Sequence, residues 1–148
     1  MVVFTIPGKP QGKARARTTK TGHTYTPEKT VLYENLVKTC FMEMTPRQTW
    51  FNGEPLALTI YATFSIPKSK TKKEKLMMLQ GYKYPTVKPD ADNIAKVICD
   101  ALNGVAYTDD TQIIELRVIK RYVREDTPAH VTVSIEALRS EQSGEPYK

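Results

Sequence analysis

Carboxylates and one lysine gather in the segment Lys-Pro-Asp-Ala-Asp-Asn-Ile-Ala-Lys, which holds Asp90, Asp92 and Lys96. Asp92 and Lys96 are four residues apart, so a helix that begins at Asp92 makes their side chains neighbours. Asp90 precedes that helix and can approach the same point from the incoming chain. Asp109 and Asp110 follow a reversal of the chain and can return toward the helix.

Converging carboxylates repel one another, and only a cation or a shared proton makes such a cluster favourable. The chain has two histidines and two cysteines, and the cysteines form no Cys-x-x-Cys pair, so the sequence disfavours a zinc site. Mg²⁺ is the natural cation, because it takes oxygen ligands and keeps waters for a substrate phosphate. Carboxylates, one lysine and a basic surface are the components of metal-assisted phosphodiester hydrolysis.

Each of these residues also has a structural interpretation. An aspartate at a helix start caps the helix and complements its dipole. Asp92 with Lys96 is a common exposed ion pair worth a few tenths of a kcal/mol, roughly. Asp109-Asp110 is an ordinary turn. An alternative function is therefore a non-catalytic basic DNA-binding module whose acidic cluster is structural, and both interpretations stay open from the residues alone.

The chain has a formal net charge of +6 at pH 7, which suits nucleic acid or an anionic membrane surface. No apolar stretch is long enough to span a bilayer, and the first residues lack the pattern of a signal peptide, so we expect a cytoplasmic protein with no membrane partner and with reduced thiols. The candidate DNA contacts are basic residues of the loop after the first strand, of the acidic motif and of a later strand: Lys9, Lys13, Arg15, Arg17, Lys88, Arg117 and Arg121. A second basic segment, Lys68–Lys75, is a solvated helix face or a further contact.

Hydrophobic patterning predicts the elements that position these residues. It indicates a loop over 8–25 and places strands at 2–6, 56–66, 113–123 and 129–138, and helices at 26–44, within 68–80 and at 92–103. The helix 26–44 should bury Val31, Leu32, Leu36, Cys40 and Phe41, with Thr26 as its N-cap. The helix 92–103 should bury Ile94, Val97, Ile98, Ala101 and Leu102 and expose Asp92, Lys96, Cys99 and Asn103. This order predicts an α+β fold, one domain over 1–148 with a mixed sheet packed by helices and a frayed tail at 140–148.

The motif also resembles a known family. The pattern is Asp90-x-Asp92-Asn93-x-x-Lys96, then Asp100-Ala101-Leu102-Asn103-Gly104, then Asp109-Asp110-x-Gln112-Ile113, and it is similar to the signature of the RusA Holliday junction resolvases. The opening runs Pro7-Gly8-Lys9-Pro10, Lys13-Ala14-Arg15-Ala16-Arg17 and Tyr25-Thr26-Pro27 resemble the longer, phage or prophage members. The resemblance covers most of the chain and thins after Val123.

The resemblance implies a RusA-like fold and a structure-specific endonuclease. By position, Asp90, Asp92 and Asp110 match the catalytic, metal-binding aspartates, Lys96 matches the essential lysine, and Asp109 is a further candidate ligand. The implied cofactor is Mg²⁺, with Mn²⁺ as a substitute. The implied substrate is four-way junction DNA, which a homodimer nicks on opposing strands during recombination and repair, in a bacterial or phage-infected cell.

Overall fold

The fold is built on a four-stranded sheet, seen here in a computed structural model that describes residues 1–124 and 127–139. The strands are β1 (Val2–Pro7), β4 (Leu56–Phe64), β5 (Ile113–Tyr122) and β6 (His130–Ala137), in the order β1-β6-β4-β5. β6 pairs antiparallel with β1 and β4, whereas β4 and β5 are parallel. The mixed sheet confirms the predicted α+β class, while the predicted frayed tail at 140–148 lies outside the described residues.

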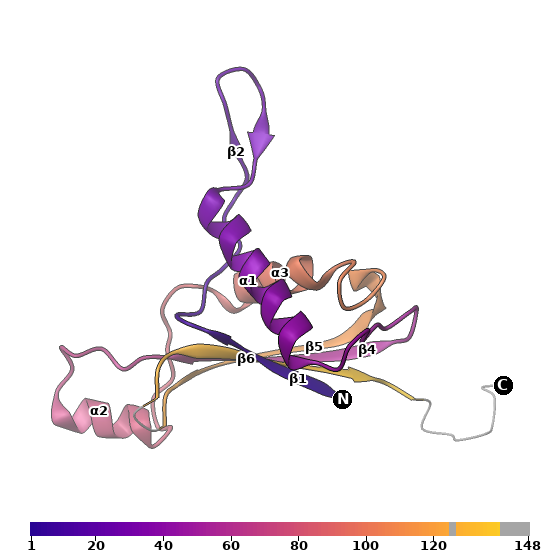
Figure 1. Cartoon of the computed structure of the whole chain (residues 1–148). Helices are drawn as coiled ribbons and strands as arrows, with labels where there is room; N and C mark the ends of the chain where they lie inside the picture. Colours follow the sequence, from indigo (N-terminus) through magenta and orange to yellow (C-terminus); the bar gives the residue numbers. More distant parts are fainter. Residues whose placement is uncertain (125–126, 140–148) are drawn as a thin grey trace.

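Two helices cover one face of this sheet. α1 (Glu28–Met44) and α3 (Ala91–Leu102) contact each other, and they pack on β1 and β5 respectively. Figure 1 shows both helices on the same side of the sheet, with α2 (Lys72–Leu79) well away from them near one end of the strands. The core lies between the sheet and the two helices, so α3 is fixed rigidly over the sheet.

The predicted apolar face of α3 is confirmed. Its five predicted core residues are fully buried, because their spacing gives one continuous apolar stripe along the helix. Cys99 was wrongly expected on the exposed side and is only 8% exposed. The segment after α3 folds back over that side, where the Tyr107 hydroxyl donates a 2.7 Å hydrogen bond to the Cys99 carbonyl.

The predicted face of α1 is partly wrong. Cys40 and Phe41 are buried as expected, but Val31 and Leu32 are 42% and 61% exposed and Leu36 is 36% exposed. The helix instead buries Thr30, Tyr33, Val37, Cys40 and Phe41. Apolar residues lie all around α1, so periodicity alone does not single out the face that meets β1 and α3. The helix also begins after Pro27, and no side chain caps it.

The region 8–25 is more ordered than the predicted loop. β2 (Arg17–Thr18) and β3 (Thr24–Tyr25) pair as a short ribbon that projects from the body beyond the N-terminal end of α1 (Figure 1). Two-residue strands carry too little periodicity to be recognised in sequence. After α3, Asp110–Gln112 form a single turn of 3₁₀ helix, η1, which leads directly into β5. Among the described residues, no helix has the length and apolar character needed to cross a membrane.

Candidate active site

One side of α3 and the start of η1 together form a pocket of about 350 Å³, which we call the carboxylate pocket. Asp92, Lys96 and Asp100 lie at successive turns of α3 and therefore share that side of the helix. Asp110 enters from η1. The pocket is lined by Asp92, Ala95, Lys96, Cys99, Asp100, Asp110, Ile113 and Leu116. The tertiary structure thus brings together three of the four predicted catalytic residues: Asp92, Lys96 and Asp110.

Lys96 forms an ion pair with Asp100, not the Asp92 pair that the sequence allowed. Its Nζ lies 3.2 Å from Asp100 Oδ1, and its side chain is 62% exposed. The other carboxylate oxygen of Asp100 lies 3.3 Å from Lys13 Nζ, which in turn lies 2.8 Å from Glu34 Oε1. Because only one oxygen of Asp100 contacts the exposed Lys96 ammonium, the remaining N–H groups of Lys96 can donate to a substrate oxygen at the pocket.

Lys13 is a half-buried member of this network. Partial burial lowers its pKa, but the hydrogen bonds to Glu34 and Asp100 and the negative charges of these two carboxylates together raise the pKa above its ordinary value. Lys13 was predicted to contact DNA, and in the structure its ammonium joins α1 to α3. Asp100 thus pairs with both Lys13 and Lys96, and Lys96 is the more exposed of the two lysines.

The pKa values of the consecutive residues Asp109 and Asp110 are shifted in opposite directions. A hydrogen bond to Asp109 raises the pKa of Asp110, and partial burial and the charges of Asp109 and Asp100 add to this rise. Hydrogen bonds from Thr111 and Asp110 lower the pKa of Asp109. Asp110 therefore lies in a field of negative charge, which a bound cation would offset.

Gln112 holds this pair of aspartates against the turn before β4. Its side-chain oxygen accepts the N–H groups of Thr108 and Asp109 at 2.9 and 3.0 Å. Its amide nitrogen donates to the carbonyls of Phe51 and Glu54 at 3.1 and 3.0 Å. The sequence reasoning gave Gln112 no role, although a glutamine three residues after an aspartate is the pattern of a capping box.

Asp90 lies apart from the carboxylate pocket. It is the N-cap residue of α3, yet its side chain makes no capping hydrogen bond. Helix capping, the structural role that the sequence allowed for this aspartate, is therefore not observed. Asp90 is one of the residues that line a neighbouring pocket instead. Across residues 1–124 and 127–139, no three histidine, cysteine, aspartate or glutamate side chains converge closely enough to hold a metal ion.

The carboxylate pocket nevertheless has the donor chemistry that Mg²⁺ needs. Mg²⁺ in phosphoryl-transfer sites is held by one or two carboxylates, with waters and substrate oxygens completing its shell, so a full protein cage is unnecessary. Asp92 and Asp110 supply such a pair from two elements facing one pocket. A hydrogen bond to Asp109 and burial raise the pKa of Asp110, and the negative charges of Asp109 and Asp100 add to the rise; a divalent cation would offset those charges.

The predicted DNA contacts fall into two groups. Lys9, Lys13, Arg17 and Lys88 line the neighbouring pocket, which we call the basic pocket, whereas Arg15 is exposed beside it. Lys29 of α1 also lines the basic pocket and was missed, because an isolated lysine at a helix start gives no sequence signal.

The second group lies on β5. Arg117 is exposed, and Arg121 lies over the ring of Tyr61 at 4.6 Å and donates through Nε to Thr63 Oγ1 at 3.3 Å. Both side chains are on one face of the strand, as their spacing requires. Arg121 is half-buried and already engaged, so Arg117 is the more accessible of the two.

Comparison with known proteins bears on the activity of this site. The family model described as endodeoxyribonuclease RusA matches residues 7–136. Among curated proteins, the chain is similar to the uncharacterized protein YqaN of Bacillus subtilis (strain 168), with 33% identity over 129 residues, covering 84% of this chain and 89% of YqaN. The family match spans the ribbon, both pockets, β4 and β5, together with all of β6 except its last residue and only the last residue of β1.

Proposed function

This chain belongs to the RusA endodeoxyribonuclease family, and from that membership we propose that it resolves four-way DNA junctions by metal-assisted hydrolysis. Membership makes the protein an endodeoxyribonuclease. The single observation that supports the metal-assisted mechanism is the carboxylate pocket, in which Asp92, Asp110 and Lys96 meet. The carboxylate pocket lies next to the basic pocket. This arrangement suits a DNA strand, because one phosphate could be cut while the positive charges of the basic pocket neutralise a neighbouring phosphate.

In this proposal Asp92 and Asp110 would hold Mg²⁺, with Mn²⁺ as a substitute, and Asp90 and Asp109 are the further predicted ligands. The bound cation would supply Lewis-acid activation of a water and neutralisation of charge on the phosphate. Asp109 would add negative charge beside Asp110, and that charge contributes to the raised pKa of Asp110. The carboxylates thereby contribute charge and orientation.

Lys96 supplies the positive side chain of the reaction centre. Its ammonium donates to an oxygen of the scissile phosphate and stabilises the extra negative charge of the transition state. Asp100 positions it, because the 3.2 Å ion pair limits the rotamers of a long and mobile side chain. Asp100 does not touch the phosphate in this scheme and acts through Lys96.

Two coordinated nicks in a junction require two such pockets, so we propose a homodimer whose two-fold axis matches the pseudo-symmetry of the junction. An exposed apolar patch on α1 supports the dimer, and it consists of Val31, Leu32 and Leu36. The products would carry 5′-phosphate and 3′-hydroxyl ends. Recombination and repair in the cytoplasm of a bacterial or phage-infected cell is the corresponding setting.

The test is incubation of a labelled four-way junction with the protein in Mg²⁺ or in EDTA. We expect paired, symmetric nicks in Mg²⁺ and binding without cleavage in EDTA, with linear duplex cut poorly in both. Gel shift without cleavage at any divalent metal concentration would favour the other candidate, a basic DNA-binding module whose carboxylates are structural.

A further inference from the structure

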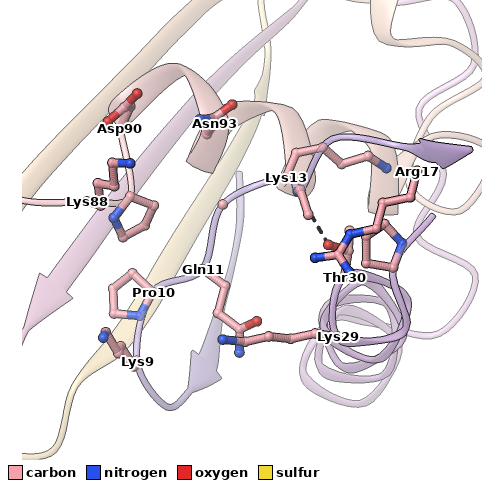
Figure 2. Close-up of a pocket in the computed structure, with 14 residues that line it drawn as sticks. Lys9, Pro10, Gln11, Lys13, Arg17, Lys29, Thr30, Lys88, Asp90 and Asn93 are labelled. Carbon is pink, nitrogen blue, oxygen red and sulfur yellow. Dashed lines mark hydrogen bonds between the residues drawn. The ribbon is translucent and has the colours of Figure 1, made fainter.

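The basic pocket is a cavity of about 490 Å³ between the loop after β1, the start of α1 and the start of α3. Figure 2 shows Lys9, Pro10 and Gln11 on the loop, Lys29 and Thr30 on α1, and Lys88, Asp90 and Asn93 at the start of α3, arranged around a common hollow. Its volume falls in the range of small-ligand sites. The catalytic scheme above uses no group of this cavity except Asp90.

The cavity is built by close backbone packing. A Cβ on Gly12 would lie 3.0 Å from the Cβ atoms of both Asn93 and Pro89, so only glycine allows the loop to approach α3 this closely. The Lys13 N–H donates to the Asn93 carbonyl at 3.0 Å, and the Ala14 N–H donates to Thr30 Oγ1 at 3.3 Å. These contacts hold the loop at a defined position between the two helices.

Positive charge dominates the lining. Lys9, Arg17, Lys29 and Lys88 line the pocket and are exposed, and none of them has an ion-pair partner among the residues that the structure describes. Lys13 also lines it, but Glu34 and Asp100 offset its charge. Among the described residues that line the pocket, Asp90 is the one acidic residue. An anion that enters this cavity therefore meets an excess of cations.

The basic pocket and the carboxylate pocket meet different sides of α3. Asn93 lines the first and Asp92 the second, and consecutive helix residues point about 100° apart. The first turn of α3 thus separates the two cavities. A strand whose scissile phosphate occupies the carboxylate pocket would pass over this turn toward the basic pocket.

We propose that the basic pocket binds a second phosphate of the DNA, one that is not cut, together with its nucleotide. Lys29, Lys9, Lys88 and Arg17 supply the charge, and Pro10, Pro27 and Pro89 supply apolar surface for the sugar or base. A concave site suits a nucleotide that projects from a sharply turned strand better than the regular backbone of a duplex. The inference rests on the proposed function, since it assumes that DNA reaches the carboxylate pocket.

The test compares two single-charge variants of α1. Lys29→Gln removes a cation inside the pocket, and Lys38→Gln removes one from the same helix outside it. Binding of a labelled junction is measured in EDTA across roughly 50 to 200 mM salt. We expect Lys29→Gln to bind on the order of tenfold more weakly and to lower the slope of log K against log salt by about 0.7 to 0.9, with little change for Lys38→Gln.

Two further experiments test whether the shape of the pocket matters as well as its charge, and whether the pocket prefers a nucleotide to a free anion. Gly12→Ala keeps every charge but displaces the loop, and it should weaken junction binding as well. Titrations with thymidine 5′-monophosphate and with inorganic phosphate, followed by backbone amide shifts, should move Gly12, Lys13 and Asn93 more for the nucleotide. Shifts with phosphate alone that are as large would reduce the site to a general anion site and overturn the nucleotide assignment.

Equal losses for Lys29→Gln and Lys38→Gln would overturn the pocket, because net charge alone would then explain binding. Since these measurements contain no Mg²⁺, they are independent of catalysis. A protein that fails to cut junctions but shows the Lys29 effect would contradict the proposed function and leave the pocket standing. Normal cleavage of junctions together with unchanged binding by Lys29→Gln would support the proposed function and contradict the basic pocket as a DNA site.

Discussion

At the scale of single residues, Lys96 separates a catalytic role from a structural one most clearly. If Lys96 only pairs with Asp100 on an exposed helix face, its removal should change stability by a few tenths of a kcal/mol, roughly. If it meets the phosphate in the transition state, Lys96→Met should cut on the order of a hundredfold more slowly, about 3 kcal/mol. Single-turnover cleavage with saturating enzyme, alongside thermal melting, measures both.

Lys96→Arg serves as the conservative comparison. It should recover the rate only partly, because a planar guanidinium does not occupy the position of an ammonium. Junction binding by Lys96→Met should stay near that of the unchanged protein. A near-normal cleavage rate for Lys96→Met would remove the catalytic role and leave the ion pair as the whole function of this lysine.

The three predicted metal ligands are not equivalent in the structure. Asp92 and Asp110 share the carboxylate pocket, whereas Asp90 lines the basic pocket. We expect Asp92→Asn and Asp110→Asn to lose Mn²⁺ binding and to slow cleavage by orders of magnitude while junction binding persists, because each removes a charge that the cation needs. Calorimetric Mn²⁺ titration and cleavage assays report the two effects.

Asp90→Asn is the informative third variant. We expect slow cleavage from it too, with a smaller loss of Mn²⁺ affinity in the absence of DNA than the other two variants show. Loss of metal affinity equal to that of Asp92→Asn would place Asp90 in the same ligand set before DNA binds. Normal cleavage would remove Asp90 from the reaction.

At the scale of elements, Gln112 holds η1 to the turn before β4 through four hydrogen bonds. Gln112→Ala should lower the free energy of unfolding by about 2 kcal/mol, because it leaves backbone groups without partners. Cleavage should fall as well, since Asp109 and Asp110 lose their support. Urea unfolding and single-turnover kinetics measure the two losses.

Gln112→Glu tests the mechanism of that loss. A glutamate side chain still accepts the N–H groups of Thr108 and Asp109 but no longer donates to the carbonyls of Phe51 and Glu54. We expect it to fall between the parent protein and Gln112→Ala in stability. Full stability in Gln112→Ala would show that backbone geometry alone holds η1 in place.

Lys13 joins three elements, because its ammonium bridges Glu34 of α1 and Asp100 of α3 from the N-terminal loop. Its pKa is higher in the folded protein than its ordinary value of 10.5, so its contribution to stability is complete below that pH and is lost as pH rises through the folded value. Lys13→Met should be less stable by about 1 kcal/mol at pH 7. In urea melts this difference should shrink above pH 10.5. A pH-independent difference would show that packing of the lysine stem, and not its charge, supplies the stability.

At the scale of the whole molecule, the proposed dimer would cover the apolar patch of Val31, Leu32 and Leu36 on α1. A charge placed there should favour the monomer, because burying it unpaired is unfavourable. Leu32→Glu should therefore halve the mass seen by light scattering, while Leu76→Glu, on the exposed side of α2, should leave it unchanged. A stable monomer of the unmodified protein, with and without junction DNA, would contradict the dimer.

Sequence alone determined much of the fold and the main chemistry. The strict apolar spacing of α3 gave its buried face, and the β-branched runs gave four strands of the mixed sheet, because periodicity reports burial directly. The fixed spacing from Asp90 to Asp110 indicated the RusA family, which the family model then showed. The local pattern of apolar residues is sufficient to predict the buried face of an element that packs against the core on one side only.

Only the tertiary structure decided which of these residues share a site. The packing of η1 against α3 places Asp110 with Asp92, and the close approach that Gly12 allows places Lys13 with Asp100 and builds the basic pocket beside Asp90. It also decided which side of α1 is buried, since that helix is apolar on several sides. Contacts between segments far apart in the chain depend on how elements pack, and no spacing within one segment encodes that packing.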